Sequence, residues 1–128
     1  MKPDLRDLFA HKLDDMARLA RDLVAIESPT TVKAAVDRLG ERIAAELAQH
    51  GAVIVIHPRD KVGDIIEGRW YTDRSGPPIL LACHLDTVHP IGAIERNPVR
   101  FQNGGPFGAA AGGVKGTVAT GTSGPPER

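Results

Sequence analysis

The chain has 128 residues, and its 16 Lys and Arg balance its 16 Asp and Glu, so the formal net charge is zero. This balance excludes the strong positive charge of typical nucleic-acid binders and of polybasic membrane binders, and we expect neither partner. The single cysteine excludes an internal disulfide framework and a four-cysteine zinc site.

No targeting or membrane segment is predicted. The first residues lack an apolar stretch behind a basic start, which a secretory signal requires. The apolar runs at residues 52–56 and 79–83 are far shorter than the roughly 20 residues of a membrane-spanning helix. We therefore expect a cytoplasmic protein, and the length suits one domain.

Residues 4–26 have the spacing of an amphipathic helix. Apolar side chains recur at three- and four-residue intervals, opposite a charged face. Pro29 ends this helix, because a proline disfavours helical backbone at the residue before it.

A second helix is predicted from the apolar stripe that runs over residues 32–47. Thr30 or Thr31 is expected to cap its N-terminus, because a hydroxyl can accept a hydrogen bond from a free N–H of the first turn. Gly51 supplies the C-terminal stop.

Three strands are expected next, at residues 52–57, 64–71 and 79–84. The first is short and β-branched, and turns precede the other two. The third is apolar at every position up to Cys83, a pattern typical of a central strand covered on both faces. Helices followed by strands predict an α/β layered domain, with Cys83 as a small buried strand residue.

The composition changes near residue 104. Residues 104–128 hold eight of the 14 glycines and few large apolar side chains. Such a segment cannot bury enough apolar area to offset its ordering entropy. We therefore divide the chain into a domain part, residues 1–103, and a Gly/Ala/Pro-rich loop or aberrant tail, residues 104–128, that we expect to be disordered.

The candidate chemistry follows the third expected strand. His84 and Asp86 lie two residues apart, so in extended backbone their side chains point to the same side. A metal-ligating histidine usually donates its other ring N–H to a carboxylate, and His-x-Asp arranges this compactly. Thr87 adds a hydroxyl to the same turn. The tripeptide alone also fits a turn with a hydrogen-bonded histidine, and a zinc site needs at least three protein ligands.

The longer segment identifies a resemblance. Residues 79–88, then His89-Pro90-Ile91-Gly92 and Asn97-Pro98-Val99-Arg100-Phe101, resemble the co-catalytic zinc metallopeptidases typified by glutamate carboxypeptidase, acetylornithine deacetylase and succinyl-diaminopimelate desuccinylase. The glutamate carboxypeptidase branch is the most similar. The resemblance covers residues 10–101 and part of 102–119. It implies a three-layer αβα zinc-peptidase catalytic domain, incomplete here, with two helices, about three strands and the Gly-rich tail.

The resemblance also implies an activity and site residues. The family uses two zinc ions and a glutamate general base to hydrolyse amide bonds of peptides or N-acyl amino acids. By this resemblance His84 is a zinc ligand and Asp86 is the catalytic carboxylate that supports the metal site. Thr87, His89 and Lys115 are candidate lining residues.

The sequence departs from the family in its second motif, Tyr-Gly-x-Gly-x-x-Asp-x-Lys-Gly-Gly. Phe107, Gly108, Lys115 and Gly116 fit in register, but Gly113 stands where the metal-bridging Asp is expected. The family's paired glutamates and remaining ligands have no counterpart here. We therefore expect at most one weak zinc site and an inactive, truncated fragment. A truncated or frame-shifted product is favoured over a diverged non-catalytic short protein.

Three functions stay open on the sequence. The first is the N-terminal part of a zinc-dependent carboxypeptidase or deacylase. The second is a metal-binding module with one weak site through His84, either alone or together with His89. The third is a protein-interaction module that offers an unpaired sheet edge, including to a second copy of itself.

Overall fold

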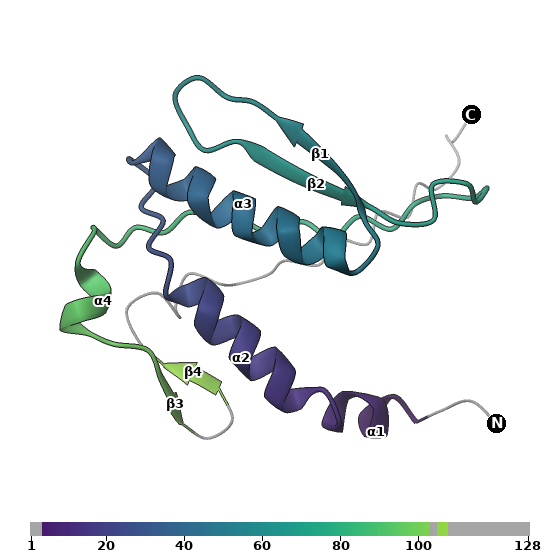
Figure 1. Ribbon diagram of the computed structural model, residues 1–128, viewed down its shortest axis with the longest axis horizontal. Helices are drawn as coiled ribbons and strands as arrows, with labels where there is room; N and C mark the ends of the chain where they lie inside the picture. Colours follow the sequence, from purple (N-terminus) through teal and green to yellow (C-terminus); the bar gives the residue numbers. More distant parts are fainter. Residues whose placement is uncertain (1–3, 103–104, 108–128) are drawn as a thin grey trace, which may run out of the picture.

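The computed structural model describes residues 4–102 and 105–107, which form four helices and four strands (Figure 1). In chain order these are α1 (Leu5–Ala10), α2 (Leu13–Val24), α3 (Lys33–Gln49), β1 (Val53–His57), β2 (Ile65–Arg69), α4 (Ala93–Arg96), β3 (Arg100–Gln102) and β4 (Gly105–Phe107). Helices are mixed with antiparallel strands, so the α/β class is confirmed at this coarse level. None of the described helices is long and apolar enough to cross a membrane.

The first expected helix is divided into α1 and α2. Asp4 caps α1 by accepting a 2.9 Å hydrogen bond from the Arg6 N–H, and a tight turn at His11 and Lys12 separates the two helices. No side chain of α1 is buried, whereas Val24 anchors the end of α2.

The second expected helix is confirmed as α3. Gly51 follows it with a φ of +81°, the left-handed conformation that ends helices, as predicted. The expected threonine cap is wrong. Val32 occupies the N-cap position and no side chain caps the helix. The Thr30 side chain faces residues 86 and 87 instead, with its hydroxyl 2.7 Å from Asp86 Oδ2 and 3.0 Å from the Thr87 carbonyl oxygen.

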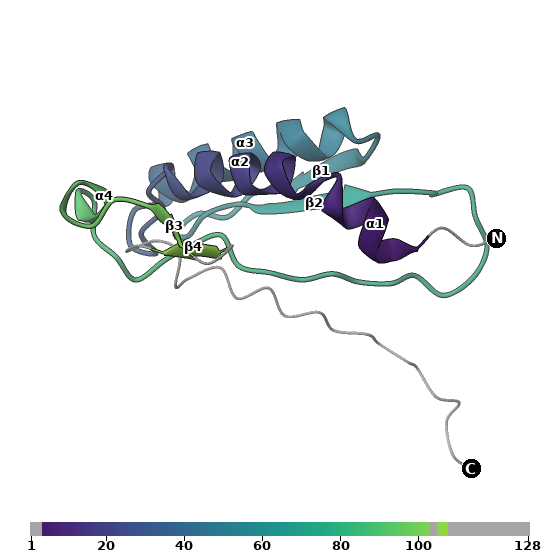
Figure 2. The same ribbon diagram turned by 90° about the horizontal axis from the view of Figure 1, so that it is seen from below.

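The β1–β2 hairpin packs against α3 (Figures 1 and 2). The strands are antiparallel, with Val53 opposite Arg69 and His57 opposite Ile65, so both expected strands are confirmed. Their partner helix supplies most of the core. The buried apolar side chains of the described residues are Val24, Ala35, Val36, Leu39 and Ala93.

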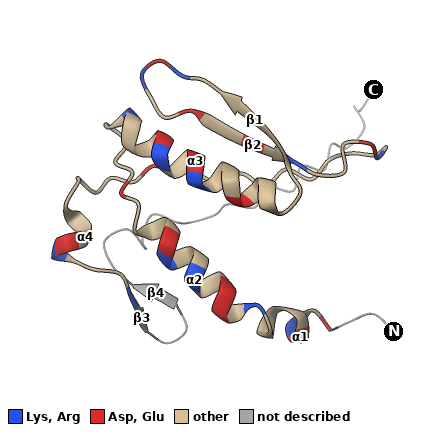
Figure 3. Cartoon of the chain, in the orientation of Figure 1, with Lys and Arg blue, Asp and Glu red and all other residues tan. Residues whose placement is uncertain are grey.

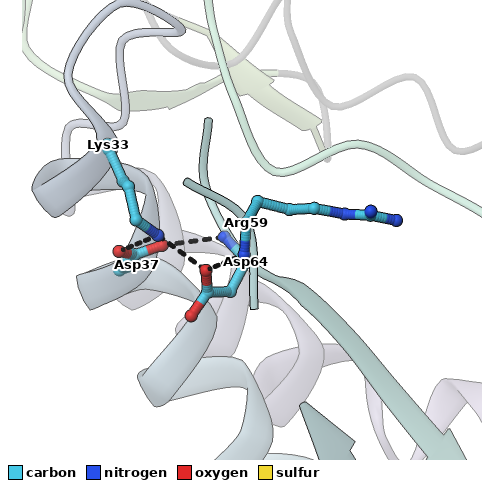
Figure 4. A network of polar contacts seen from close by, with 4 residues as sticks. All are labelled: Lys33, Asp37, Arg59 and Asp64. Carbon is cyan, nitrogen blue, oxygen red and sulfur yellow. Dashed lines mark hydrogen bonds and ion pairs between the residues drawn. The ribbon is translucent and has the colours of Figure 1, made fainter. Parts of the chain in front are cut away.

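An ion cluster fixes the β1–β2 loop to the start of α3 (Figure 4). Lys33 Nζ lies 2.8 Å from Asp37 Oδ2 and 2.6 Å from Asp64 Oδ1. The Asp64 N–H donates to Asp37 Oδ1 at 2.8 Å, and the Arg59 backbone N–H donates to Asp64 Oδ1 at 2.9 Å. The hydrogen bond to Asp37, and then the one to Asp64, raises the pKa of Lys33. The cluster is therefore a structural clamp on the loop.

The third expected strand is wrong. Residues 79–81 and 83–86 have no regular secondary structure, and Ile79, Leu80 and Leu81 are 80%, 65% and 70% exposed. Figure 2 shows this stretch returning toward α4 as an extended segment apart from the β1–β2 hairpin. An apolar strand is stable in a sheet centre only when neighbours cover both of its faces, and the described elements do not provide that cover. Cys83 is correspondingly exposed and not buried.

The C-terminal part of the chain contributes one short strand to the described structure. β4 lies within the expected tail and pairs antiparallel with β3, Arg100 opposite Phe107. Residues 104 and 108–128, including Lys115, lie outside the described residues. The division of the chain at residue 103 stays a prediction.

Charges of both signs alternate along α2 and α3 (Figure 3). On the hairpin, Glu67 lies between Arg69 and His57: Arg69 Nε is 2.5 Å from Oε1, and His57 Nε2 is 2.8 Å from Oε2. The Arg69 hydrogen bond, followed by that of His57, lowers the pKa of Glu67 from 4.5 to about 2. The Glu67 carboxyl is therefore ionised in the folded protein at pH values where the same carboxyl is already protonated in the unfolded chain.

We expect Glu67→Gln to reduce the acid sensitivity of the fold. A depressed folded-state pKa contributes stability that is present above pH 4.5 and is lost as the pH falls toward about 2. Urea unfolding at pH 6 and pH 3 measures the loss, which should be smaller in the variant than in the wild type. Glu41→Gln, which removes an exposed carboxylate of α3, is the matched control. An equal loss in wild type and Glu67→Gln would contradict the prediction.

Candidate functional site

The segment around His84 and Asp86 docks on the linker between α2 and α3. The Thr87 N–H donates to the Ser28 carbonyl at 2.8 Å, and the Thr30 N–H donates to the Thr87 carbonyl at 2.9 Å. These two bonds flank Pro29, which pairs in parallel with Thr87 and has no N–H of its own to donate. Two stretches more than 50 residues apart are thereby held side by side.

The buried side chain of Ser28 also connects the α2–α3 linker to the segment around His84 and Asp86. This side chain is the most buried polar group of the described residues, with 2% exposure, and its hydroxyl donates to the Leu85 carbonyl at 2.7 Å. The Leu85 side chain lies beside Gly40 of α3, which the Ile66 side chain of β2 also approaches. Because Leu85 faces the core, the alternation of extended backbone turns His84 and Asp86 away from it.

His84 and Asp86 lie side by side, but the histidine ring approaches the Asp86 backbone oxygen more closely than the carboxylate that the sequence pattern favoured as its partner. His84 Nδ1 lies 2.7 Å from the Asp86 backbone oxygen and 3.5 Å from Asp86 Oδ1. Both side chains reach solvent, with 54% and 38% exposure. Asp86 Oδ2 accepts a 2.7 Å hydrogen bond from the Thr30 hydroxyl.

This geometry fixes the histidine tautomer. A carbonyl oxygen can only accept, so Nδ1 carries the proton in the bond to Asp86. In neutral His84 the lone pair is therefore on Nε2. An imidazole whose Nδ1–H is held by an oxygen and whose Nε2 is unprotonated has the arrangement found in metal-ligating histidines.

The Asp86 carboxylate is held in its ionised form. The Thr30 hydroxyl lowers the pKa of Asp86 most, and the nearby His84 lowers it further. Imidazole nitrogen and carboxylate oxygen are both ligand types that zinc accepts. By ligand type, His84 and Asp86 could therefore supply two of the ligands of a zinc site.

Glu27 ties the following turn to the same linker. Its Oε2 accepts from the Gly92 N–H at 2.8 Å and its Oε1 from the Ile94 N–H at 3.0 Å. These backbone hydrogen bonds lower the pKa of Glu27. Gly92 has a φ of +85°, a conformation that favours glycine. The turn between Asp86 and α4 is thus fixed at both ends.

Of the predicted site residues, His84, Asp86 and Thr87 are brought together, with Thr87 acting through its backbone. His89 is half-buried, and its lining role stays a prediction. Lys115 lies outside the described residues. Within the described part of the chain, no group of three His, Cys, Asp or Glu side chains is close enough to hold a metal.

The sequence interpretation missed Glu27, Ser28 and Thr30 as parts of the site. It assigned this stretch to a helix end and a helix cap, which are local roles. Their partners lie between 56 and 67 residues away, and no local pattern marks such contacts. The one signal was a run of small polar residues beside a proline.

Comparisons with known proteins do not assign the chain to a family. No protein-family model matches the chain, and no curated protein matches it either.

Proposed function

We propose that the chain carries the His-x-Asp part of the zinc site of an amide hydrolase. The substrate class is peptides or N-acyl amino acids, cleaved by a carboxypeptidase or deacylase of the co-catalytic metallopeptidase type. The three-layer αβα catalytic domain belongs to the same proposal. The single observation that carries it is the 2.7 Å bond from His84 Nδ1 to the Asp86 carbonyl, which leaves Nε2 for a metal.

Each residue has a distinct part in the proposed site. His84 binds the metal through Nε2, and Asp86 orients the ring from the Nδ1 side. When bound, zinc lowers the pKa of a coordinated water and polarises the substrate carbonyl. The clamp formed by Ser28 and Thr87 keeps residues 84–86 in the extended conformation that this division of roles requires.

The proposed binding is weak. A zinc site needs at least three protein ligands, and the described residues bring together only His84 and Asp86. Gly113, where the resemblance expects the metal-bridging Asp, has no side chain to coordinate a metal. We therefore expect the 128-residue chain to bind at most one zinc ion and not to hydrolyse amide substrates.

Metal titration tests the proposal. Equilibrium dialysis with zinc, and visible absorption with cobalt as a substitute, measure the affinity of the full chain. His84→Ala should weaken binding by at least about 10-fold, since loss of even an outer-shell partner costs roughly 10–100-fold. His11→Ala removes an exposed histidine at the α1–α2 junction and is the matched control. Equal affinity in wild type and His84→Ala would refute the metal site.

The gene sequence tests the hydrolase assignment separately. We would read the DNA from codon 100 through several hundred bases beyond codon 128. A frame that encodes Asp-x-Lys-Gly-Gly, a Glu-Glu pair and a distal His supports a zinc hydrolase. Unrelated downstream sequence argues against it.

A non-catalytic interaction module is the second candidate. The observation that favours it is the exposed apolar run of Ile79, Leu80 and Leu81, since exposed apolar patches mark interaction sites. Self-association over this run is the simplest form of that function. A chain that retains no zinc above the His84→Ala level would favour this candidate.

A further inference from the structure

Three neighbouring side chains, Thr30, Asp86 and His84, connect the α2–α3 linker to the proposed metal site. The Thr30 hydroxyl donates to Asp86 Oδ2 at 2.7 Å, and Asp86 Oδ1 lies 3.5 Å from His84 Nδ1. Thr30 comes from the linker before α3, and the other two come from the segment 56 residues later. The orientation of Asp86 therefore depends on a residue outside the His-x-Asp motif.

The Thr30 hydroxyl has one proton and two acceptors within reach. The Thr87 carbonyl is 3.0 Å away and already accepts the Thr30 backbone N–H at 2.9 Å. The Asp86 carboxylate is closer and charged, and hydrogen bonds to ionised acceptors are the stronger ones. The hydroxyl proton therefore belongs to Asp86 Oδ2.

This bond settles which oxygen faces the histidine. With Oδ2 held by Thr30, Oδ1 is the oxygen turned toward the Nδ1 side of His84. Without it, the half-exposed carboxylate can rotate about its side-chain torsions. The His84 ring is held by the Asp86 backbone oxygen, 2.7 Å from Nδ1, so the carboxylate 3.5 Å away acts on the ring through its charge and not through a hydrogen bond.

We infer that Thr30 is a positioning residue of the site: its hydroxyl fixes the Asp86 carboxylate beside the Nδ1 edge of His84, where the negative charge favours a cation at Nε2. The metal part of this inference rests on the proposed function, whereas the orientation of Asp86 by Thr30 does not. Thr30 touches neither the metal nor a substrate.

Thr30→Val separates this role from a structural one. Valine keeps the β-branched shape and removes only the hydroxyl. The backbone bonds of residues 30 and 87 do not need that hydroxyl, so the docking of the two stretches should persist. Thr30→Ser restores the hydroxyl, and Thr31→Val makes the same substitution at the exposed neighbouring position.

The first measurement needs no metal. Three-bond NMR couplings from the backbone to Asp86 Cγ report whether its side chain holds one χ1 rotamer. We expect a single rotamer in the wild type, Thr30→Ser and Thr31→Val, and averaged couplings in Thr30→Val. A single rotamer in Thr30→Val, with dispersed amide spectra showing that it folds, would overturn the inference.

The second measurement is cobalt affinity of the same four proteins. We expect Thr30→Val to bind about 10-fold more weakly than the others, within the range known for outer-shell partners. Equal affinity would overturn the role of Thr30 toward the metal. If the wild type binds no cobalt but the Asp86 rotamer still depends on Thr30, the proposed function fails and the positioning of Asp86 stands.

Discussion

Replacing Gly63 with alanine is expected to lower the free energy of unfolding by about 1–3 kcal/mol, the usual penalty of overpacking. The added Cβ would lie 2.7 Å from Val36 Cβ and closer still to Val36 Cγ1. Val36 is 5% exposed and β-branched, so it can neither leave the core nor rotate freely. The backbone of the loop cannot withdraw easily either, because the next residue, Asp64, is clamped to Lys33 and Asp37.

Urea unfolding measures this effect, and a double-mutant cycle locates its cause. In a Val36→Ala background the Cγ1 clash is gone, so the further penalty of Gly63→Ala should shrink. Lys61→Ala changes an exposed position of the same loop and should leave the unfolding midpoint near that of the wild type. Alanine keeps the Cβ at position 36, so the penalty should not vanish. A full penalty in the Val36→Ala background would show that the contact with Val36 Cγ1 is not its source.

The helices and the hairpin could be predicted from the sequence because their signals are local. The apolar stripe of residues 32–47, the left-handed Gly51 and the β-branched run at residues 52–57 each act within one element. Residues 79–84 show the limit of such reasoning. Their apolar pattern reports a preference for burial, but whether a strand forms depends on partners elsewhere, and the described elements do not supply them.

In the candidate site, too, the local contact could be predicted from the sequence and the long-range contact could not. The meeting of His84 and Asp86 follows from the two-residue alternation of extended backbone and was predicted. The contacts of Thr30 were not, because a threonine before a helix already has a local explanation as a cap. Because the cap role already explained Thr30, nothing in the sequence indicated a distant partner. Only the fold shows that the Thr30 hydroxyl donates to Asp86.

Ser28→Ala is expected to loosen the site from its inner side. The hydroxyl of Ser28 donates to the Leu85 carbonyl at 2.7 Å where the serine is 2% exposed. Removing one partner of a buried hydrogen bond costs about 1–3 kcal/mol, because the remaining group loses its partner without regaining water. The free energy of unfolding should fall by this amount in urea titrations. Ser75→Ala, at an exposed loop position, should change it little.

Hydrogen exchange shows where the loosening occurs. The Thr87 N–H donates to the Ser28 carbonyl, so its exchange should accelerate in Ser28→Ala more than that of amides within α3. Thr30→Val should leave this amide protected, because it changes the Asp86 carboxylate and not the backbone pairing. Acceleration spread evenly over the chain would mean that Ser28 supports the fold as a whole. Acceleration confined to residues 85–87 would mean that Ser28 holds the backbone that carries His84 and Asp86, while Thr30 sets the direction of the carboxylate.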